Sequence, residues 1–233
     1  MKLFALFVLA LICSTYVINA SITLESIEEV TADFCPECVS FMDESLQTIL
    51  NIILNGGVIG GCDELCSLLN QSEVITTLCN LACDAVGIKV FIYLIQKADL
   101  DSIWMCEECK LCPVKDGNAT IISTDVQPKS GPAGTTFQLT MIYQVTEETG
   151  TGTVEVDIQP IDGMPLGDAE LIIKQADGSY KITWSIQTEA SDDDPWGPGK
   201  AEVDFFVCDG ECGSKHAHSK IYSTATNYFT ITE

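Results

Sequence analysis

Nine of the chain's 12 cysteines lie between residues 35 and 112, and they constrain the fold more than any other feature of the sequence. The residues between them repeat apolar side chains every three or four positions, which is typical of amphipathic helices. Two C-x3-C pairs each place two thiols one turn apart on a helix face. Around a turn near Asn70, these pairs suit an antiparallel hairpin with Cys66–Cys79 and Cys62–Cys83 bridges.

The cysteines at the two ends of this stretch suit a second ladder of bridges. An early C-x2-C pair and a closing C-x5-C pair would give Cys35–Cys112 and Cys38–Cys106. Sequence alone does not fix this connectivity. The early pair also resembles the redox motif of thioredoxin-like proteins, but no strand precedes it, so we favour structural bridges.

The N-terminus has the layout of a secretory signal peptide over residues 1–20, with a positive start at Lys2 and cleavage expected after Ala20. Its apolar core is about half the ~20 residues that a membrane span needs, and we expect no transmembrane span elsewhere. We therefore expect a secreted chain, with a lysosomal or endosomal lumen as the alternative. These compartments permit disulfides. Cys13 leaves with the signal, so an odd number of cysteines remains.

Charge and motif content argue against several classes of function. The net charge is −23, which makes nucleic acid a poor partner because phosphate binding needs clustered basic residues. The only histidines are His216 and His218, and no catalytic motif is present, so we expect a non-enzyme without a cofactor. These histidines with Cys208 and Cys212 make a zinc site conceivable. A secreted chain rarely keeps free thiolates, so we expect a local Cys208–Cys212 disulfide and no metal.

The period of the apolar residues changes to strict alternation after a linker at Pro113–Asn118. About seven short strands separated by turn signals indicate an immunoglobulin-like sandwich. We place the helical domain at residues 31–114 and the β domain at residues 119–233. The strand candidates are Thr120–Val126, Thr136–Val145, Thr153–Gln159, Glu170–Lys174, Tyr180–Gln187, Ala201–Val207 and Lys220–Ile231.

The order and spacing of the cysteines over Phe34 to Pro113 resemble those of the saposin B-type domain. The resemblance implies Cys35–Cys112, Cys38–Cys106 and Cys66–Cys79. Cys62–Cys83 adds a fourth bridge, and Cys109 is left unpaired. The expected fold is an α + β multidomain chain, with an N-terminal saposin-like disulfide-linked helical domain and a C-terminal immunoglobulin-like antiparallel β-sandwich.

Saposin-like domains expose an apolar face to lipid, and this chain has side chains of that kind. For most of them, a place in the core is an equally good interpretation. The lipid-facing candidates are Val39, Met42, Leu46, Ile49, Ile53, Val90, Tyr93 and Leu94.

A secreted helical domain followed by a β domain with Ser130-Gly-Pro-Ala-Gly134 and Cys208-Asp-Gly-Glu-Cys212 resembles the countin family of social amoebae. The resemblance implies a non-enzymatic subunit of a secreted complex that limits group size by altering cell–cell adhesion. The alternative is a saposin-like protein that binds lipid or perturbs membranes. Expected partners are other subunits or a second copy, with Cys109 as a candidate for a covalent bridge. Asn70 and Asn118 begin glycosylation sequons.

Overall fold

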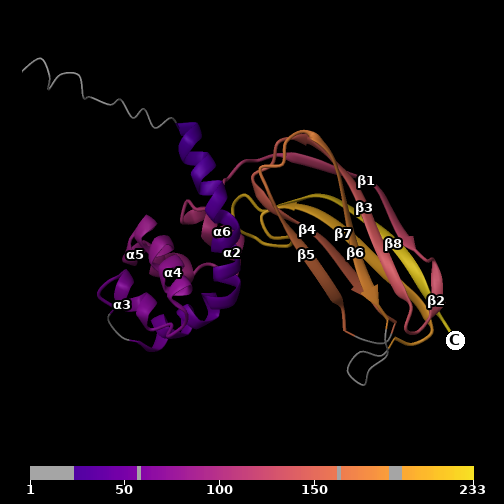
Figure 1. Ribbon diagram of the computed structural model, residues 1–233, viewed down its shortest axis with the longest axis horizontal. Coiled ribbons are helices and arrows are strands. Elements are labelled where there is room, and N and C mark those ends of the chain that lie inside the picture. Colours follow the sequence, from indigo (N-terminus) through magenta and orange to yellow (C-terminus); the bar gives the residue numbers. More distant parts are fainter. Residues whose placement is uncertain (1–23, 57–58, 162–163, 189–195) are drawn as a thin grey trace, which may run out of the picture. The chain divides into compact units, whose positions relative to one another are not determined.

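The computed structural model describes residues 24–233 except 57–58, 162–163 and 189–195 (Figure 1). Its contacts divide the chain into Met1–Val30 and Thr31–Glu233. The expected signal peptide at residues 1–20 lies outside the described residues. The features considered below belong to the second unit, which holds both the disulfide-linked helices and the sheets.

The described helices lie in the first part of the chain, and local signals set several of their ends. The Ser72 hydroxyl accepts a hydrogen bond from the backbone N–H of Ile75 and caps one helix. Gly87, with a φ of 81°, separates two helices that are bent by 106° at this break. The helices are α2 (Leu24–Asn55), α3 (Cys62–Ser67), α4 (Glu73–Val86), α5 (Ile88–Ile95) and α6 (Ser102–Glu108).

Four disulfides join these helices around a shared core. Cys35–Cys112 and Cys38–Cys106 span 77 and 68 residues, and they tie α2 to α6 and to the segment that follows it. Cys62–Cys83 and Cys66–Cys79 join α3 to α4. These are the same pairs that the spacing suits. The largest fully buried side chains of this core are Met42, Ile49, Leu65, Phe91 and Met105.

The second part of the chain forms two sheets, drawn as arrows in Figure 1. The strand order is β1-β3-β6 in the three-stranded sheet and β2-β8-β7-β4-β5 in the five-stranded sheet. The strands are β1 (Asn118–Gln127), β2 (Ser130–Pro132), β3 (Thr136–Glu147), β4 (Thr151–Gln159), β5 (Leu166–Ile173), β6 (Gly178–Gln187), β7 (Gly199–Asp209) and β8 (Lys220–Thr232).

Alternation along the strands places one apolar face of each sheet in a common core. β3 alternates between buried and more exposed residues along most of its length, as a half-buried strand does. Phe137 of β3 stacks on Phe229 of β8, and Trp184 of β6 lies against Phe205 of β7. Each of these contacts joins one sheet to the other, so the core lies between the sheets.

One strand was not anticipated from the sequence. Ser130–Pro132 reads as a turn, but it forms β2 and pairs in parallel with Thr230–Thr232 of β8. A three-residue strand is too short to show alternation, so periodicity does not reveal it. The five-stranded sheet is therefore mixed, not purely antiparallel.

The expected fold class is wrong. The structure is mostly β, and α3, α5 and α6 contain only 6, 8 and 7 residues. Cysteine spacing indicates that two thiols share a helix face, but it does not predict the length of the helix. The helical region is small, and it does not make a clear saposin-like domain. The first described helix, α2, begins at Leu24, before the first cysteine of the helical region, and continues through Pro36.

Candidate functional site

The helices and the sheets meet at a stacked pair of rings. Trp104 of α6 lies against His216 of the β7–β8 loop, with ring centroids 4.1 Å apart and planes inclined by 14°. The Nε2 atom of His216 lies 3.0 Å from the backbone oxygen of Ala98, to which it donates when it carries the proton. The ring of His216 is therefore contacted on its face by Trp104 and at its edge by the backbone oxygen of Ala98. We call this contact between α6 and the β7–β8 loop, together with its surroundings, the junction.

Asp101 holds both sides of the junction. Its Oδ1 atom accepts a hydrogen bond of 2.7 Å from the backbone N–H of Trp104, which caps α6. Its Oδ2 atom accepts a hydrogen bond of 2.6 Å from the hydroxyl of Ser214 in the β7–β8 loop. Asp101 is only 4% exposed. One carboxylate thus fixes the start of a helix and the position of a loop more than 100 residues away.

The β7–β8 loop is held in turn by β4. Cys208 and Cys212 form a disulfide, so their sulfur atoms are not free to bind a metal. The carboxylate of Glu155 accepts hydrogen bonds from the Thr153 hydroxyl at 2.6 Å and from the backbone N–H of Cys212 at 3.3 Å. A disulfide and a partly buried acceptor therefore set the loop that presents His216.

The segment expected to be a linker packs closely against β4. The backbone oxygen of Pro113 accepts hydrogen bonds from both the N–H and the hydroxyl of Thr151, at 3.0 and 2.9 Å. A Cβ atom added to Gly150 would lie 2.5 Å from the backbone nitrogen of Lys115. Glycine at this position is needed because two backbones approach each other closely. The connection between helices and sheets is therefore packed into the structure.

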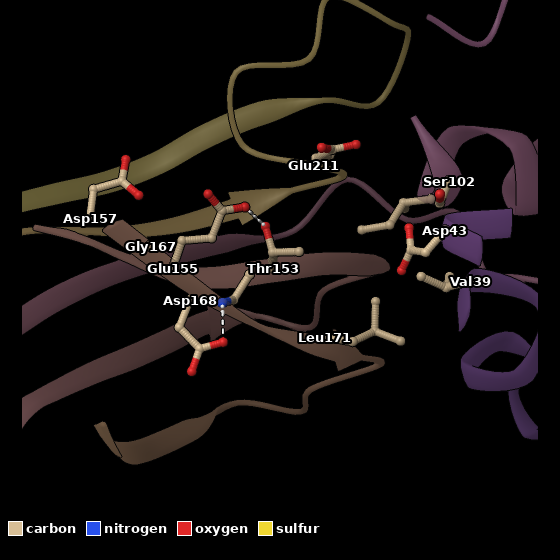
Figure 2. Close-up of a pocket in the computed structure, with 12 residues that line it drawn as sticks. Val39, Asp43, Ser102, Thr153, Glu155, Asp157, Gly167, Asp168, Leu171 and Glu211 are labelled. Carbon is tan, nitrogen blue, oxygen red and sulfur yellow. Dashed lines mark hydrogen bonds between the residues drawn. The ribbon is translucent and has the colours of Figure 1, made fainter. Parts of the chain in front are cut away.

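An acidic cleft of about 350 Å³ opens at the junction. Figure 2 shows residues that line it, which come from α2, α6, β4, β5 and the β7–β8 loop. Its lining includes Val39 and Leu171 on the apolar side, and it includes no basic residue. Such a cleft attracts cationic groups by its charge. The carboxylates that line it are Asp43, Glu155, Asp157, Asp168 and Glu211.

Burial changes the acidity of carboxyl groups in α6, at the end of β7 and in the β7–β8 loop. Burial, with the nearby charges of Asp209 and Asp101, raises the pKa of Glu107 to about 8. Burial also raises the pKa of Asp209 to about 6 and that of Glu211 to about 7. Glu107 is 3% exposed and holds its proton near neutral pH.

The remaining candidate site residues lie in different environments. Asn70, at the turn between α3 and α4, and Asn118, at the start of β1, are both exposed. Cys109 is a fully buried free thiol, and burial raises its pKa to about 12. Its sulfur atom is therefore neither accessible nor ionised at neutral pH.

The lipid-facing candidates fall mostly in the core. Val39, Met42, Leu46, Ile49 and Leu94 are at most 8% exposed. Ile53 is partly buried and packs against the same cluster. Val90 and Tyr93 of α5 are exposed, at 48% and 59%. The eight side chains therefore do not form one outward apolar face.

No single described helix is both long enough and apolar enough to cross a membrane. α4 and α5 meet the length and composition criteria only as a pair, and the pair is bent by 106°.

Comparison with known proteins assigns the chain to a family. The family model named Countin N-terminal domain matches residues 33–110, and the model named Countin C-terminal domain matches residues 119–233. Countin-3 of Dictyostelium discoideum is 35% identical over 231 residues, which cover 99% of each chain. The chain belongs to the countin family. The resemblance to countins drawn from the sequence is confirmed.

A second countin shows a similar likeness. Countin-1 of Dictyostelium discoideum is 34% identical over 223 residues, which cover 95% of this chain and 84% of Countin-1. Among solved structures, the alkylpurine DNA glycosylase AlkC of Pseudomonas fluorescens is similar over 73% of this chain and 53% of its own, with 12% identity. Its TM-score of 0.42 is too low to carry an argument about this countin-family chain.

Sequence reasoning did not identify the junction of this countin-family chain. His216 suggested a metal ligand, but the structure stacks it on Trp104. The hydrogen bond between Asp101 and Ser214 was not anticipated either. A contact between a loop and the start of a helix produces no repeating pattern of apolar residues, so periodicity does not predict it.

Proposed function

We propose that the chain is a secreted signalling factor, a subunit of a complex that limits group size and cell–cell adhesion in aggregating social amoebae. The observation that carries this proposal is membership of the countin family over both parts of the chain. A match over one part alone could reflect a domain that is shared by proteins of different function. The matched ranges flank the packed segment at residues 111–118.

The disulfides support secretion. Five bridges are present, and disulfides form and persist in oxidising compartments outside the cytosol. The layout of residues 1–20 agrees with export. A test is to collect the culture medium of cells that express the full chain. Recovery of the chain from cells alone, with none in the medium, would contradict secretion.

A non-enzymatic role is part of the proposal. The side chains best suited to proton transfer or nucleophilic attack already have structural tasks. His216 stacks on Trp104, and His218 Nδ1 lies 3.0 Å from a carboxylate oxygen of Asp116. Cys109 is buried. Binding through a fixed surface therefore fits these residues better than catalysis.

The lipid-binding alternative receives less support. Five of its eight candidate residues are buried, so an opening of the helical core would have to precede contact with lipid. The contacts at the junction instead hold the helices against the sheets, so that both parts act as one unit. We therefore favour an assembled signal over a lipid carrier.

Gene deletion tests the signalling role in the organism that carries this chain. We expect cells without the gene to form larger groups on aggregation, and expression of the full chain to restore the original size. The matched control is expression of the Cys35→Ala/Cys112→Ala variant, in which the long bridge between the helices is lost. Groups of unchanged size after deletion would contradict the proposal.

A further inference from the structure

The outer faces of the two sheets differ in charge. On the five-stranded sheet, acidic side chains alternate with the buried residues of β4 and β7. On the three-stranded sheet, β6 contains no acidic residue, and Asp125 of β1 forms an ion pair of 2.7 Å with Lys129. The carboxylates of the acidic face are Glu155, Asp157, Glu202 and Asp204.

The contrast matters because the chain as a whole has a net charge of −23. Two copies of such a chain repel each other over most of their surfaces. Salt screens charges beyond about 8 Å at physiological ionic strength, so repulsion acts mainly where acidic groups come close. The outer face near β6 is therefore a place where two copies can approach without opposing their carboxylates.

β6 is also an open edge of its sheet. It pairs with β3 over its whole length, from Gly178 opposite Val145 to Gln187 opposite Thr136. Within the part of the chain that the structure describes, no strand pairs with the other side of β6. An edge strand of ten residues leaves backbone N–H and C=O groups facing outward, and these groups can pair with another strand.

The other edges of the two sheets carry protection that β6 lacks. β2 has only three residues and ends at Pro132. β5 carries Asp168 and Glu170 in its exposed stretch. Charges and proline on an edge strand discourage pairing, and so do short edge strands.

The remaining edge, β1, is held against β8 by side-chain hydrogen bonds. The hydroxyl of Ser223 accepts from the backbone N–H of Ile121 at 3.1 Å, and the Asn227 amide donates to the backbone oxygen of Thr124 at 3.2 Å. β6 differs from β2, since it has ten residues and no proline, and from β5, since Lys181 is its one charged side chain.

We propose that β6 pairs in antiparallel fashion with β6 of a second copy, around a two-fold axis, and joins the two three-stranded sheets into one continuous sheet. Across a two-fold axis a surface meets its own copy, so an acidic surface would meet an acidic surface. β6 avoids this conflict. Its outward side chains include Ser179, Thr183 and Ser185, which are exposed and small enough to pair across strands.

The alternation of β6 limits the register of this pair. Side chains directly opposite each other must point to the same face, so odd-numbered residues face odd-numbered residues. With Thr183 on the axis, Lys181 lies opposite Ser185 of the second copy. The pair then brings no like charges together. This inference does not rest on the proposed signalling role, and its test does not measure signalling.

The test compares two variants of the purified full chain that add the same charge. Thr183→Glu places an acidic group on β6 directly opposite its own copy, and Thr224→Glu places one at an exposed position of β8 on the other sheet. Sedimentation equilibrium over a range of concentrations gives the dimer dissociation constant of each chain. We expect at least ~100-fold weaker dimerisation for the β6 variant, because opposed like charges cost several kcal/mol, and a change of only a few-fold for the β8 variant.

A second measurement on the unmodified chain keeps the test independent of variant folding. Hydrogen exchange of the β6 amides should slow as protein concentration rises, while exchange in β5 stays constant. A chain that stays monomeric at every concentration would overturn the proposal. So would equal weakening of the dimer by both variants, or β6 amides whose exchange does not depend on concentration.

Discussion

Trp104 of α6 and His216 of the β7–β8 loop stack face to face, 4.1 Å between centroids, and this contact joins the disulfide-linked helices to the sheets. Both residues are partly buried. The flanking bonds of Asp101 to Trp104 and Ser214 hold the same two elements together. The junction is therefore a defined set of contacts whose parts can be removed one at a time.

Loss of the ring stack should weaken the fold. We expect His216→Ala to lower the free energy of unfolding by about 1–2 kcal/mol, because a stacked aromatic pair contributes about 0.5–1.5 kcal/mol beyond the area it buries. Urea unfolding monitored by tryptophan fluorescence measures the change. The matched control is His218→Ala, whose partner Asp116 is exposed. We expect a loss below about 0.5 kcal/mol there, and equal losses for both variants would count against the stack.

Removal of the Asp101 carboxylate should cost more than removal of its loop partner. We expect Asp101→Ala to destabilise the chain by about 2–3 kcal/mol, since it removes a helix cap and leaves the partly buried hydroxyl of Ser214 without its acceptor. Ser214→Ala keeps the helix cap but removes the hydroxyl's bonds to Asp101 and to the backbone N–H of His216, and it should cost about 1 kcal/mol. Thermal unfolding of both variants checks the order. The reverse order would show that the helix cap is unimportant.

Stability should fall as pH rises through the range set by Glu107. The pKa of this group is raised from 4.5 to about 8 in the folded chain, so between these values only the unfolded chain loses the proton. The contribution of Glu107 to the free energy of unfolding is therefore full below pH 4.5 and is lost as pH approaches 8. The loss is at most about 1.4 kcal/mol for each unit by which the pKa is raised. Asp209, with a pKa raised to about 6, acts in the same direction at lower pH.

Glu107→Gln should reduce this dependence of the free energy of unfolding on pH between 5 and 8, measured by urea titrations at each pH. Glu44→Gln, the same substitution at an exposed position of α2, is the control. We expect the control to keep the slope of the unmodified chain. A Glu107→Gln variant with an unchanged slope would show that this carboxyl group does not stay protonated in the folded protein.

Gly150 tests the close packing of the segment before β1. Gly150→Ala would bring a methyl group to 2.5 Å from the backbone nitrogen of Lys115, so one backbone has to move. We expect a loss of about 1–3 kcal/mol, the range for overpacking a well-packed site. Gly61 has no neighbouring atom within 4 Å of an added Cβ, and Gly61→Ala should be nearly neutral. Similar unfolding midpoints for both variants would contradict the packing.

The sequence predicted those features of this chain that depend on local spacing. Cysteines one turn apart suggested the bridges between α3 and α4, and alternation located β3 and β6 within two residues of their ends. Alternation did not detect β2, which has three residues. Spacing also overestimated the helical part, because a thiol pair one turn apart needs only the six residues of α3.

The acidic cleft and the junction depend on contacts between distant segments. Asp101 and Ser214 are 113 residues apart, and neither stands out by type or by neighbours. The burial that raises the pKa of Glu107 likewise comes from the packing of α6 near β7. Such features depend on how one element packs against another. The local periodicity of the sequence does not predict that packing.

The most direct measurement of the central claim is the size of the groups that starved Dictyostelium discoideum cells form when the purified full chain is added. A countin-family signal that limits group size should shrink the groups in proportion to the amount added. The same protein with its disulfides reduced and alkylated should have no effect, because the helices lose their bridges. Groups that keep their size at every concentration of the intact chain would contradict the account.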